Sequence, residues 1–111
     1  MTSFEDREKA FENKFKYDQD ILFKIQSRRA KLVGLWAAER LGLKGADAEA
    51  YAQQVVSTDL DEPGTNDIVR KLRADFQAKN IEISEHRIEK ELEKQLEAAR
   101  LQVVPQLQAK D

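Results

Sequence analysis

The chain has 111 residues, 41% hydrophobic and 36% charged, with 19 Lys and Arg against 21 Asp and Glu and a formal net charge of −2. This length supports one domain, and the slightly negative charge argues against bulk affinity for nucleic acid or an anionic membrane. The absence of cysteine excludes a disulfide framework and Cys-based metal sites, while the charged N-terminus and the lack of a long apolar run predict a cytoplasmic protein without membrane insertion.

The first predicted helix runs from about residue 3 to residue 41, where Gly42 and Gly45 end it. Its N-terminal part is highly charged but carries one thin apolar stripe at helical spacing. The residues of this stripe are Phe4, Phe11, Phe15 and Leu22. A stripe this thin cannot form a core of its own, but it can lie in a groove on another protein.

This first helix would span about 58 Å, more than the shorter helices after it could cover. Its apolar second half is expected to enter the core, with Trp36 as a core anchor and Gly34 allowing a neighbouring helix to approach closely. The first half is then expected to project from the bundle, to be mobile or disordered when free, and to fold on binding. We therefore divide the chain into a partner-binding segment, residues 1–20, and a bundle domain, residues 21–111.

Three further helices are predicted from caps and apolar periodicity. They begin at Asp47, Thr65 and Ser84, and Pro105 is expected to kink or end the last of them. Because the connections are short, four helices imply an all-α, antiparallel four-helix bundle.

The acidic loop at residues 58–64 invites comparison with a calcium-binding EF-hand. Asp59, Asp61 and Gly64 fit the first, third and sixth positions of such a loop. Pro63 at the fifth position and Arg70 at the twelfth lack the required carboxylate or other side-chain oxygen. A solvated turn between helices is therefore the better interpretation.

No other residue pattern indicates catalysis or cofactor binding. His86 has neither a second histidine nor a cysteine with which to bind zinc, and it is expected to be exposed near a helix start. No glycine-rich phosphate loop or nucleophile-elbow serine occurs. The basic residues Arg28, Arg29 and Lys31, and the alternating charges at residues 89–94, are typical of solvated helix faces. We predict that the protein is not an enzyme and needs no cofactor or metal.

The sequence contains several distinctive motifs: Phe4-Glu5-Asp6-Arg7-Glu8-Lys9-Ala10, Lys14-Phe15, Phe23-Lys24, Arg28-Arg29 and Leu35-Trp36-Ala37-Ala38. With these motifs the chain resembles, over nearly its whole length, the ATPase-inhibitor zeta subunit of alphaproteobacterial F-type ATP synthases. The resemblance implies a four-helix bundle whose N-terminal segment inserts at a catalytic interface between the α and β subunits of the ATPase head, near the γ stalk. The segment would fold into a helix there, blocking hydrolytic rotation while rotation in the synthesis direction expels it.

The same resemblance implies roles for individual residues of the N-terminal segment. Phe4, Phe11 and Phe15 would be the apolar contacts with the ATPase. Charged residues would set register and orientation against the partner; they are Asp6, Arg7, Glu8, Glu12, Lys14 and Lys16. The resemblance further implies a position peripheral to the membrane through ATP synthase, and weak adenine-nucleotide binding, for which the sequence carries no motif.

Two other functions fit the sequence. A helical adaptor could use the N-terminal segment on a different protein, or a structural protein could close its own dimer through the first helix. Removal of residues 1–19 separates the three. An inhibitor would lose inhibition with its bundle folded, a dimer would lose association and stability, and an adaptor would have no effect on the ATPase.

Overall fold

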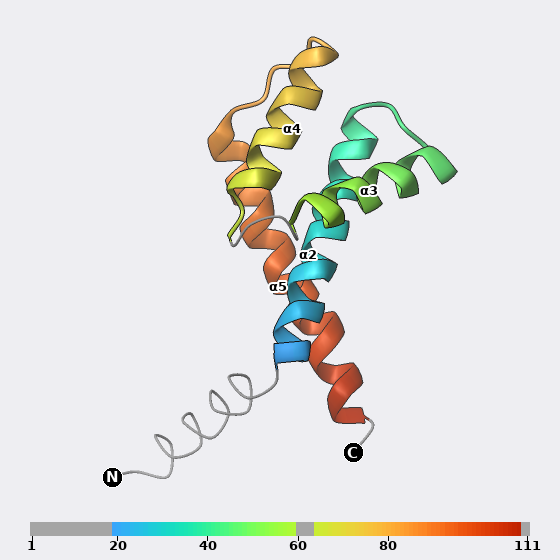
Figure 1. Ribbon diagram of the computed structural model, residues 1–111, viewed down its shortest axis with the longest axis vertical. Helices are drawn as coiled ribbons and strands as arrows, with labels where there is room; N and C mark the ends of the chain where they lie inside the picture. The colour runs from blue at the N-terminus through green and yellow to red at the C-terminus, as the bar shows by residue number, and fades with distance from the viewer. Residues whose placement is uncertain (1–18, 60–63, 110–111) are drawn as a thin grey trace.

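A computed structural model of the protein describes residues 19–59 and 64–109, with side chains of the last helix described as far as Val104. These two ranges contain four helices and no strand (Figure 1). The helices are α2 (Gln19–Arg40), α3 (Gly45–Asp59), α4 (Asn66–Ala78) and α5 (Glu85–Ala109). The predicted all-α fold is confirmed, whereas the predicted first half of the long helix lies outside the described residues.

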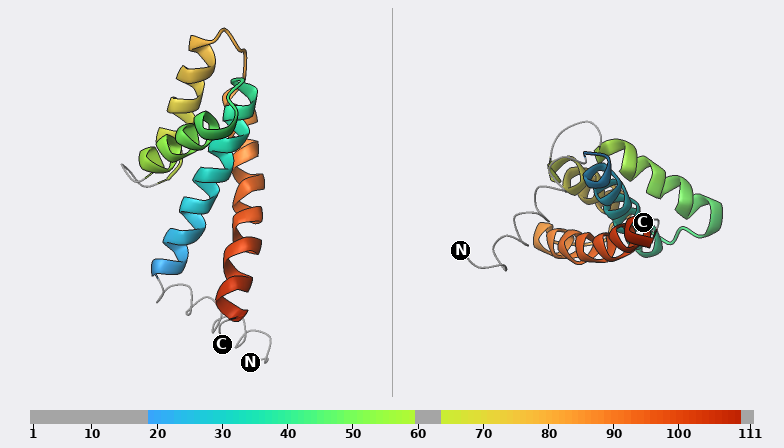
Figure 2. Two further views of the ribbon diagram at one scale, coloured as in Figure 1. Left: turned by 90° about the vertical axis from the view of Figure 1, so that its right-hand side faces the viewer. Right: turned by 90° about the horizontal axis from the view of Figure 1, so that it is seen from below.

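α2 and α5 lie side by side and run in opposite directions along the long axis of the molecule (Figures 1 and 2). α3 crosses the C-terminal half of α2 obliquely, and α4 packs against α3 and α5 at the same end. The result is an elongated body of 55 × 28 × 21 Å. The predicted antiparallel bundle is confirmed, and α2 makes its most extensive helix contacts, with α3 and α5.

The ends of two helices follow from residues that adopt a left-handed backbone conformation. Gly42, with a φ of 82°, ends α2 as predicted. The backbone N–H of Gly42 donates to the carbonyl of Glu39 (3.1 Å), and that of Leu43 donates to the carbonyl of Ala38 (2.9 Å). This is a Schellman motif, which satisfies the last carbonyls of the helix. Asn80, with a φ of 58°, ends α4 in the same way.

The start of α5 confirms the predicted Ser84 cap, because the Ser84 hydroxyl accepts the backbone N–H of Arg87 at 3.0 Å. Thr65 occupies the predicted N-cap position of α4, but its side chain forms no capping hydrogen bond. Pro105 does not end α5, which continues to Ala109. A proline removes one backbone hydrogen bond, and the helix continues past that gap.

α3 begins at Gly45, two residues before the predicted cap Asp47. The backbone N–H of Asp47 already donates to the carbonyl of Lys44 at 3.1 Å, so Asp47 lies within the first turn. Its carboxylate is still favourably placed, because the N-terminus of a helix carries partial positive charge.

Buried apolar side chains form two separate clusters. The main core joins the C-terminal half of α2 to α3, α4 and the first half of α5. Its largest fully buried members are Phe76, Ile68, Leu72, Ile88, Val33 and Val55. The second cluster joins only α2 and α5, and consists of Ile21, Ile25, Ala99 and Val103 with the partly buried Leu32, Leu96 and Val104 at its edges.

Gly34 determines how closely α3 approaches α2. A Cβ atom at residue 34 would lie 2.7 Å from the Cα of Ala52 and 3.2 Å from the Cβ atoms of Ala52 and Val55. The backbones of the two helices therefore meet at a point where only glycine fits. This confirms the close approach predicted from the sequence, and it identifies α3 as the neighbouring helix.

Candidate functional site

All nine residues predicted to contact the partner lie between residues 4 and 16, outside the described residues. The structure therefore neither brings them together nor separates them, and their roles stay predictions from the sequence. The same holds for the division at residue 20. What the structure does describe is the body to which this segment is joined at Gln19.

The segment is joined to the body through the first turns of α2. Ile21 and Ile25 are buried there, and they cluster with Ala99 and Val103 of α5. Because α2 and α5 are antiparallel, Ile21 lies toward Val103 and Ile25 toward Ala99. Burial of these side chains holds the start of α2 against α5. Phe23, between them in sequence, is 52% exposed and points away from this contact.

The basic residues of α2 do not share one solvated face, although the sequence suggested that they would. Arg28 and Arg29 are half-buried and immediately precede the buried Ala30. Lys31 forms an ion pair of 3.8 Å with Glu49 of α3, and both side chains are substantially exposed, so this pair adds little stability. Arg29 approaches the end of α3: burial raises the pKa of the Asp59 carboxyl, and the nearby Arg29 charge partly offsets that effect.

A polar cluster covers one edge of the main core around Trp36. The Trp36 and Phe76 rings pack edge-to-face, with their centroids 6.1 Å apart. The guanidinium groups of Arg40 and Arg87 lie 4.8 and 5.0 Å from the centroid of the Trp36 ring. Trp36 is therefore a half-buried member of the core, as predicted, and it also binds two cations through its ring. Arg87 in turn donates to the carboxylate of Glu91 at 3.0 Å.

Glu91 is a buried carboxylate that was not predicted from the sequence. It was assigned to an exposed charged run, yet it is only 2% exposed. Its carboxylate accepts hydrogen bonds from Arg87 at 3.0 Å and Gln95 at 2.7 Å, each one helical turn away. Two features of the sequence could have indicated its burial. Glu91 lies beside the apolar residues Ile88 and Leu92, and hydrogen-bonding partners stand four residues before and after it.

This arrangement predicts that Glu91 contributes to stability in a pH-dependent way. Burial raises the pKa of the Glu91 carboxyl, but the hydrogen bonds from Gln95 and Arg87, together with the positive charges of Lys94 and Arg87, outweigh burial and hold the pKa below its usual value. A lowered pKa in the folded state means that the contribution is full above the unfolded pKa of about 4.3 and is lost as pH falls through the folded pKa.

We therefore expect Glu91→Gln to cost about 1 kcal/mol in the free energy of unfolding at pH 7, with a smaller difference from the unaltered chain near pH 3. Urea denaturation followed by circular dichroism at several pH values measures this. Glu93→Gln, an exposed position on the same helix, is the matched control. A Glu91→Gln cost that is the same at pH 7 and pH 3 contradicts the assignment.

A second network links α3 to α4. The hydroxyl of the buried Tyr51 donates to Asp75 at 2.7 Å, and Lys71 donates to the same carboxylate at 3.1 Å. Burial and the Asp75 carboxylate raise the pKa of Tyr51, so this phenol stays protonated and keeps its hydrogen bond throughout the physiological range. The network has a structural role, because its groups satisfy one another.

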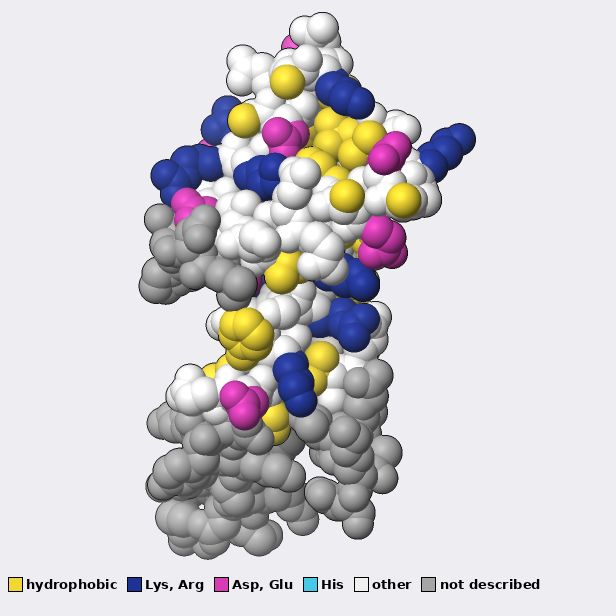
Figure 3. Space-filling view, turned by 45° about the vertical axis from the view of Figure 1, so that its right-hand side comes forward, with side chains coloured by type: hydrophobic (Ala, Val, Ile, Leu, Met, Phe, Trp, Pro, Cys, Tyr) yellow, Lys and Arg dark blue, Asp and Glu magenta, His cyan; other side chains and the backbone are white. Residues whose placement is uncertain are grey.

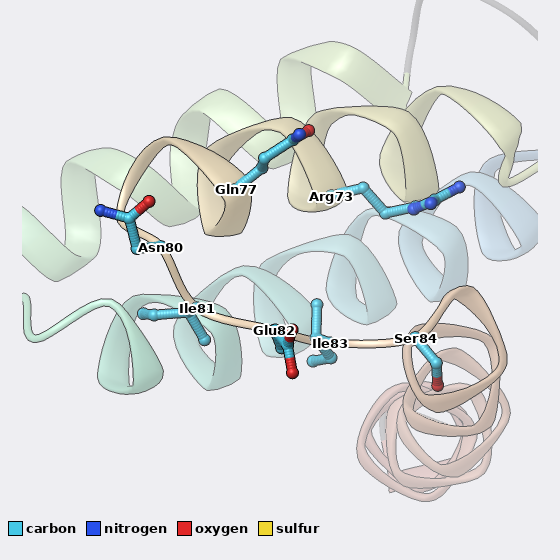
Figure 4. Close-up of a pocket in the computed structure, with 7 residues that line it drawn as sticks. All are labelled: Arg73, Gln77, Asn80, Ile81, Glu82, Ile83 and Ser84. Carbon is cyan, nitrogen blue, oxygen red and sulfur yellow. The ribbon is translucent and has the colours of Figure 1, made fainter.

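An open groove lies between α4 and the connection to α5 (Figure 4). Its volume is about 750 Å³, and it is lined by Arg73, Gln77, Asn80, Ile81, Glu82, Ile83 and Ser84. A smaller hollow of about 370 Å³ shares Arg73 with it. Arg73 forms an ion pair of 3.4 Å with Glu85, and both side chains are more than half exposed.

His86 is exposed in the first turn of α5, as predicted. In residues 19–59 and 64–109, no group of three or more His, Asp or Glu side chains is arranged to hold a metal ion. Within the same ranges, no helix is both long and apolar enough to cross a membrane.

Comparison with known proteins identifies relatives of this chain. The family described as ATPase inhibitor subunit zeta matches residues 1–102. Three chains among solved structures match. One of them, a protein solved by solution NMR, is 38% identical, covers 76% of this chain and 95% of its own length, and superposes with a TM-score of 0.66. A search of curated proteins gives no significant match.

Proposed function

This chain belongs to the ATPase inhibitor subunit zeta family, and on that basis we propose that it inhibits ATP hydrolysis by F-type ATP synthase through its N-terminal segment, residues 1–20. The segment inserts at a catalytic interface between the α and β subunits of the ATPase head, near the γ subunit, and becomes helical there. It blocks rotation in the hydrolysis direction, and rotation in the synthesis direction expels it.

The observation that carries this proposal is the extent of the family match. The match begins at residue 1 and reaches residue 102, so it includes both the apolar stripe of the N-terminal segment and the helical body. Phe4, Phe11 and Phe15 repeat on one side of a helix, as anchors of a helix bound in a groove do. The charged residues between them set register against the partner.

The shape of the body supports its role as a stop. A single helix with its side chains is about 10–12 Å wide. The body measures 28 and 21 Å across its two shorter axes. A groove that accepts one helix therefore excludes the part of the body where α3 and α4 pack on α2. In this proposal the body limits how far the segment enters.

The decisive experiment is a titration of ATP hydrolysis by the cognate F-type ATPase. The full chain is expected to inhibit, and the triple variant Phe4→Ala/Phe11→Ala/Phe15→Ala is expected to lose inhibition while its circular dichroism and thermal transition stay close to those of the unaltered chain. Leu101→Ala, which truncates an apolar side chain that is 65% exposed on α5, is the control and is expected to inhibit normally. Inhibition by the triple variant at unchanged potency contradicts the assignment of the site.

A parallel assay of ATP synthesis tests the direction of the block. The full chain is expected to leave synthesis almost unchanged at concentrations that stop hydrolysis. Equal inhibition of both directions contradicts the ratchet mechanism, and no inhibition of either favours an adaptor that uses the same segment on another protein.

Weak adenine-nucleotide binding stays a separate proposal that rests on family resemblance alone. Titration of the ¹⁵N-labelled chain with ADP, followed through amide chemical shifts, tests it directly. Saturable shifts in one contiguous group of residues support a site, and the absence of shifts at millimolar ADP contradicts one.

A further inference from the structure

The end of the body nearest the N-terminal segment is built from two helices only. This distal arm comprises residues 19–28 of α2 and 97–109 of α5, while α3 and α4 pack at the opposite end (Figures 1 and 2). Its buried side chains, Ile21, Ile25, Ala99 and Val103, form a cluster separate from the main core. The arm therefore has its own small apolar contact and does not share the packing that stabilises the rest of the body.

The buried side chains that close the arm are apolar, and they are fewer than those of the main core. Among the described residues, no ion pair or side-chain hydrogen bond joins residues 22–32 of α2 to α5, whereas the main body has several such links, including Arg73 to Glu85 at 3.4 Å between α4 and α5. Pro105, in the α5 part of the arm, removes a backbone hydrogen-bond donor from that helix. Regions with few buried apolar contacts open at lower free energy than the whole fold.

The outer surface of the arm is apolar at two points. The exposed large hydrophobic residues of the described chain are Phe23, at 52%, and Leu101, at 65%, and both belong to the arm. Figure 3 shows hydrophobic side chains at the surface of this narrow end, among several basic ones. An end that is only two helices thick cannot cover both faces of either helix, so Phe23 and Leu101 stay exposed even when the arm is closed.

We propose that the distal arm opens as a unit while the main core stays folded, and that opening frees the α5-facing side of α2 for the partner that binds the N-terminal segment. This inference rests on the function proposed above. The stripe of that segment reaches the arm at Leu22, whose helical neighbours Ile21 and Ile25 are covered by α5 in the closed arm. α5 is thus a strap that competes with the ATPase for α2 and limits the length of helix available for insertion.

A reversible disulfide across the arm tests this competition. The chain contains no cysteine, so Ile25→Cys/Ala99→Cys can form only one intramolecular disulfide. The oxidised variant is expected to inhibit ATP hydrolysis about tenfold more weakly than the same protein after reduction, because binding then requires a state that the staple forbids. The two single-cysteine variants and the unaltered chain, with and without reductant, control for the substitutions and for effects of reductant on the ATPase.

The outcomes separate this inference from the proposed function. If the unaltered chain inhibits and the oxidised and reduced forms of the double-cysteine variant are equally potent, α5 does not compete with the ATPase for α2, and the inhibitory role stands. If the unaltered chain does not inhibit, the proposed function itself fails.

Opening of the arm is also measured without the ATPase. In native-state hydrogen exchange of the unaltered chain, amides of residues 22–28 and 99–104 are expected to exchange by a local opening, while those of residues 33–38 and 68–76 exchange only on global unfolding. If both groups show the same dependence on denaturant, the arm is not an independent unit and the inference is overturned. This measurement decides the case even if the double-cysteine variant is inactive in both redox states.

Discussion

Replacement of Phe76 by alanine is expected to lower the free energy of unfolding by about 3–5 kcal/mol, enough to unfold a marginally stable domain of this size. Phe76 is fully buried on α4, and its ring packs edge-to-face with that of Trp36 of α2, with 6.1 Å between the ring centroids. Truncation removes the largest fully buried side chain of the main core and leaves a cavity where α2 and α4 meet. Guanidinium denaturation followed by circular dichroism measures the loss.

Phe23→Ala is the matched control for this prediction, because Phe23 is half exposed on the outer surface of α2. The same change of side chain is expected to cost less than about 1 kcal/mol there. A similar cost at both positions would mean that the main core does not depend on Phe76 as its packing indicates.

Gly34→Ala is expected to destabilise the fold by about 2 kcal/mol, although alanine favours an isolated helix over glycine by about 1 kcal/mol. The added Cβ would lie 2.7 Å from the Cα of Ala52, and a backbone atom of α3 cannot move without shifting the whole helix. The steric effect therefore exceeds the gain in helix propensity. Thermal and urea denaturation of the variant measure the balance.

Ala74→Gly provides the opposite case, because Ala74 is exposed on α4. That substitution is expected to cost about 1 kcal/mol through helix propensity alone. Glycine is thus preferred at residue 34 and alanine at residue 74, for separate physical reasons. Stabilisation by Gly34→Ala would show that α2 and α3 do not approach each other as closely as described.

Local chemistry allowed much of the fold to be predicted. Gly42 ends α2 because glycine adopts the left-handed conformation of a Schellman motif, and Ser84 caps α5 because its hydroxyl accepts a backbone N–H. Both effects depend on a few consecutive residues. The start of α3 was misplaced by two residues, because Asp47 is favourable both at a cap and within the first turn.

Knowledge of the candidate site comes almost wholly from the sequence. The stripe of Phe4, Phe11 and Phe15 is visible as helical periodicity. The family resemblance, which rests on short sequence motifs, is confirmed by the family match to residues 1–102. The binding roles of these residues stay predictions, since residues 4–16 lie outside the described structure. Their geometry depends on a partner surface, which the isolated chain does not contain.

By itself, then, the sequence determined the helical class, most helix ends, the family and the segment that is the best candidate for partner binding, because each is written in residues close together in the chain. Only the tertiary structure decided that Glu91 is buried, that Gly34 meets Ala52, and that Ile21 and Ile25 pack in a cluster apart from the main core. Those features depend on which helices meet and how far each extends. Periodicity shows that a helix has an apolar side, but it does not show which neighbour covers that side or where the cover ends.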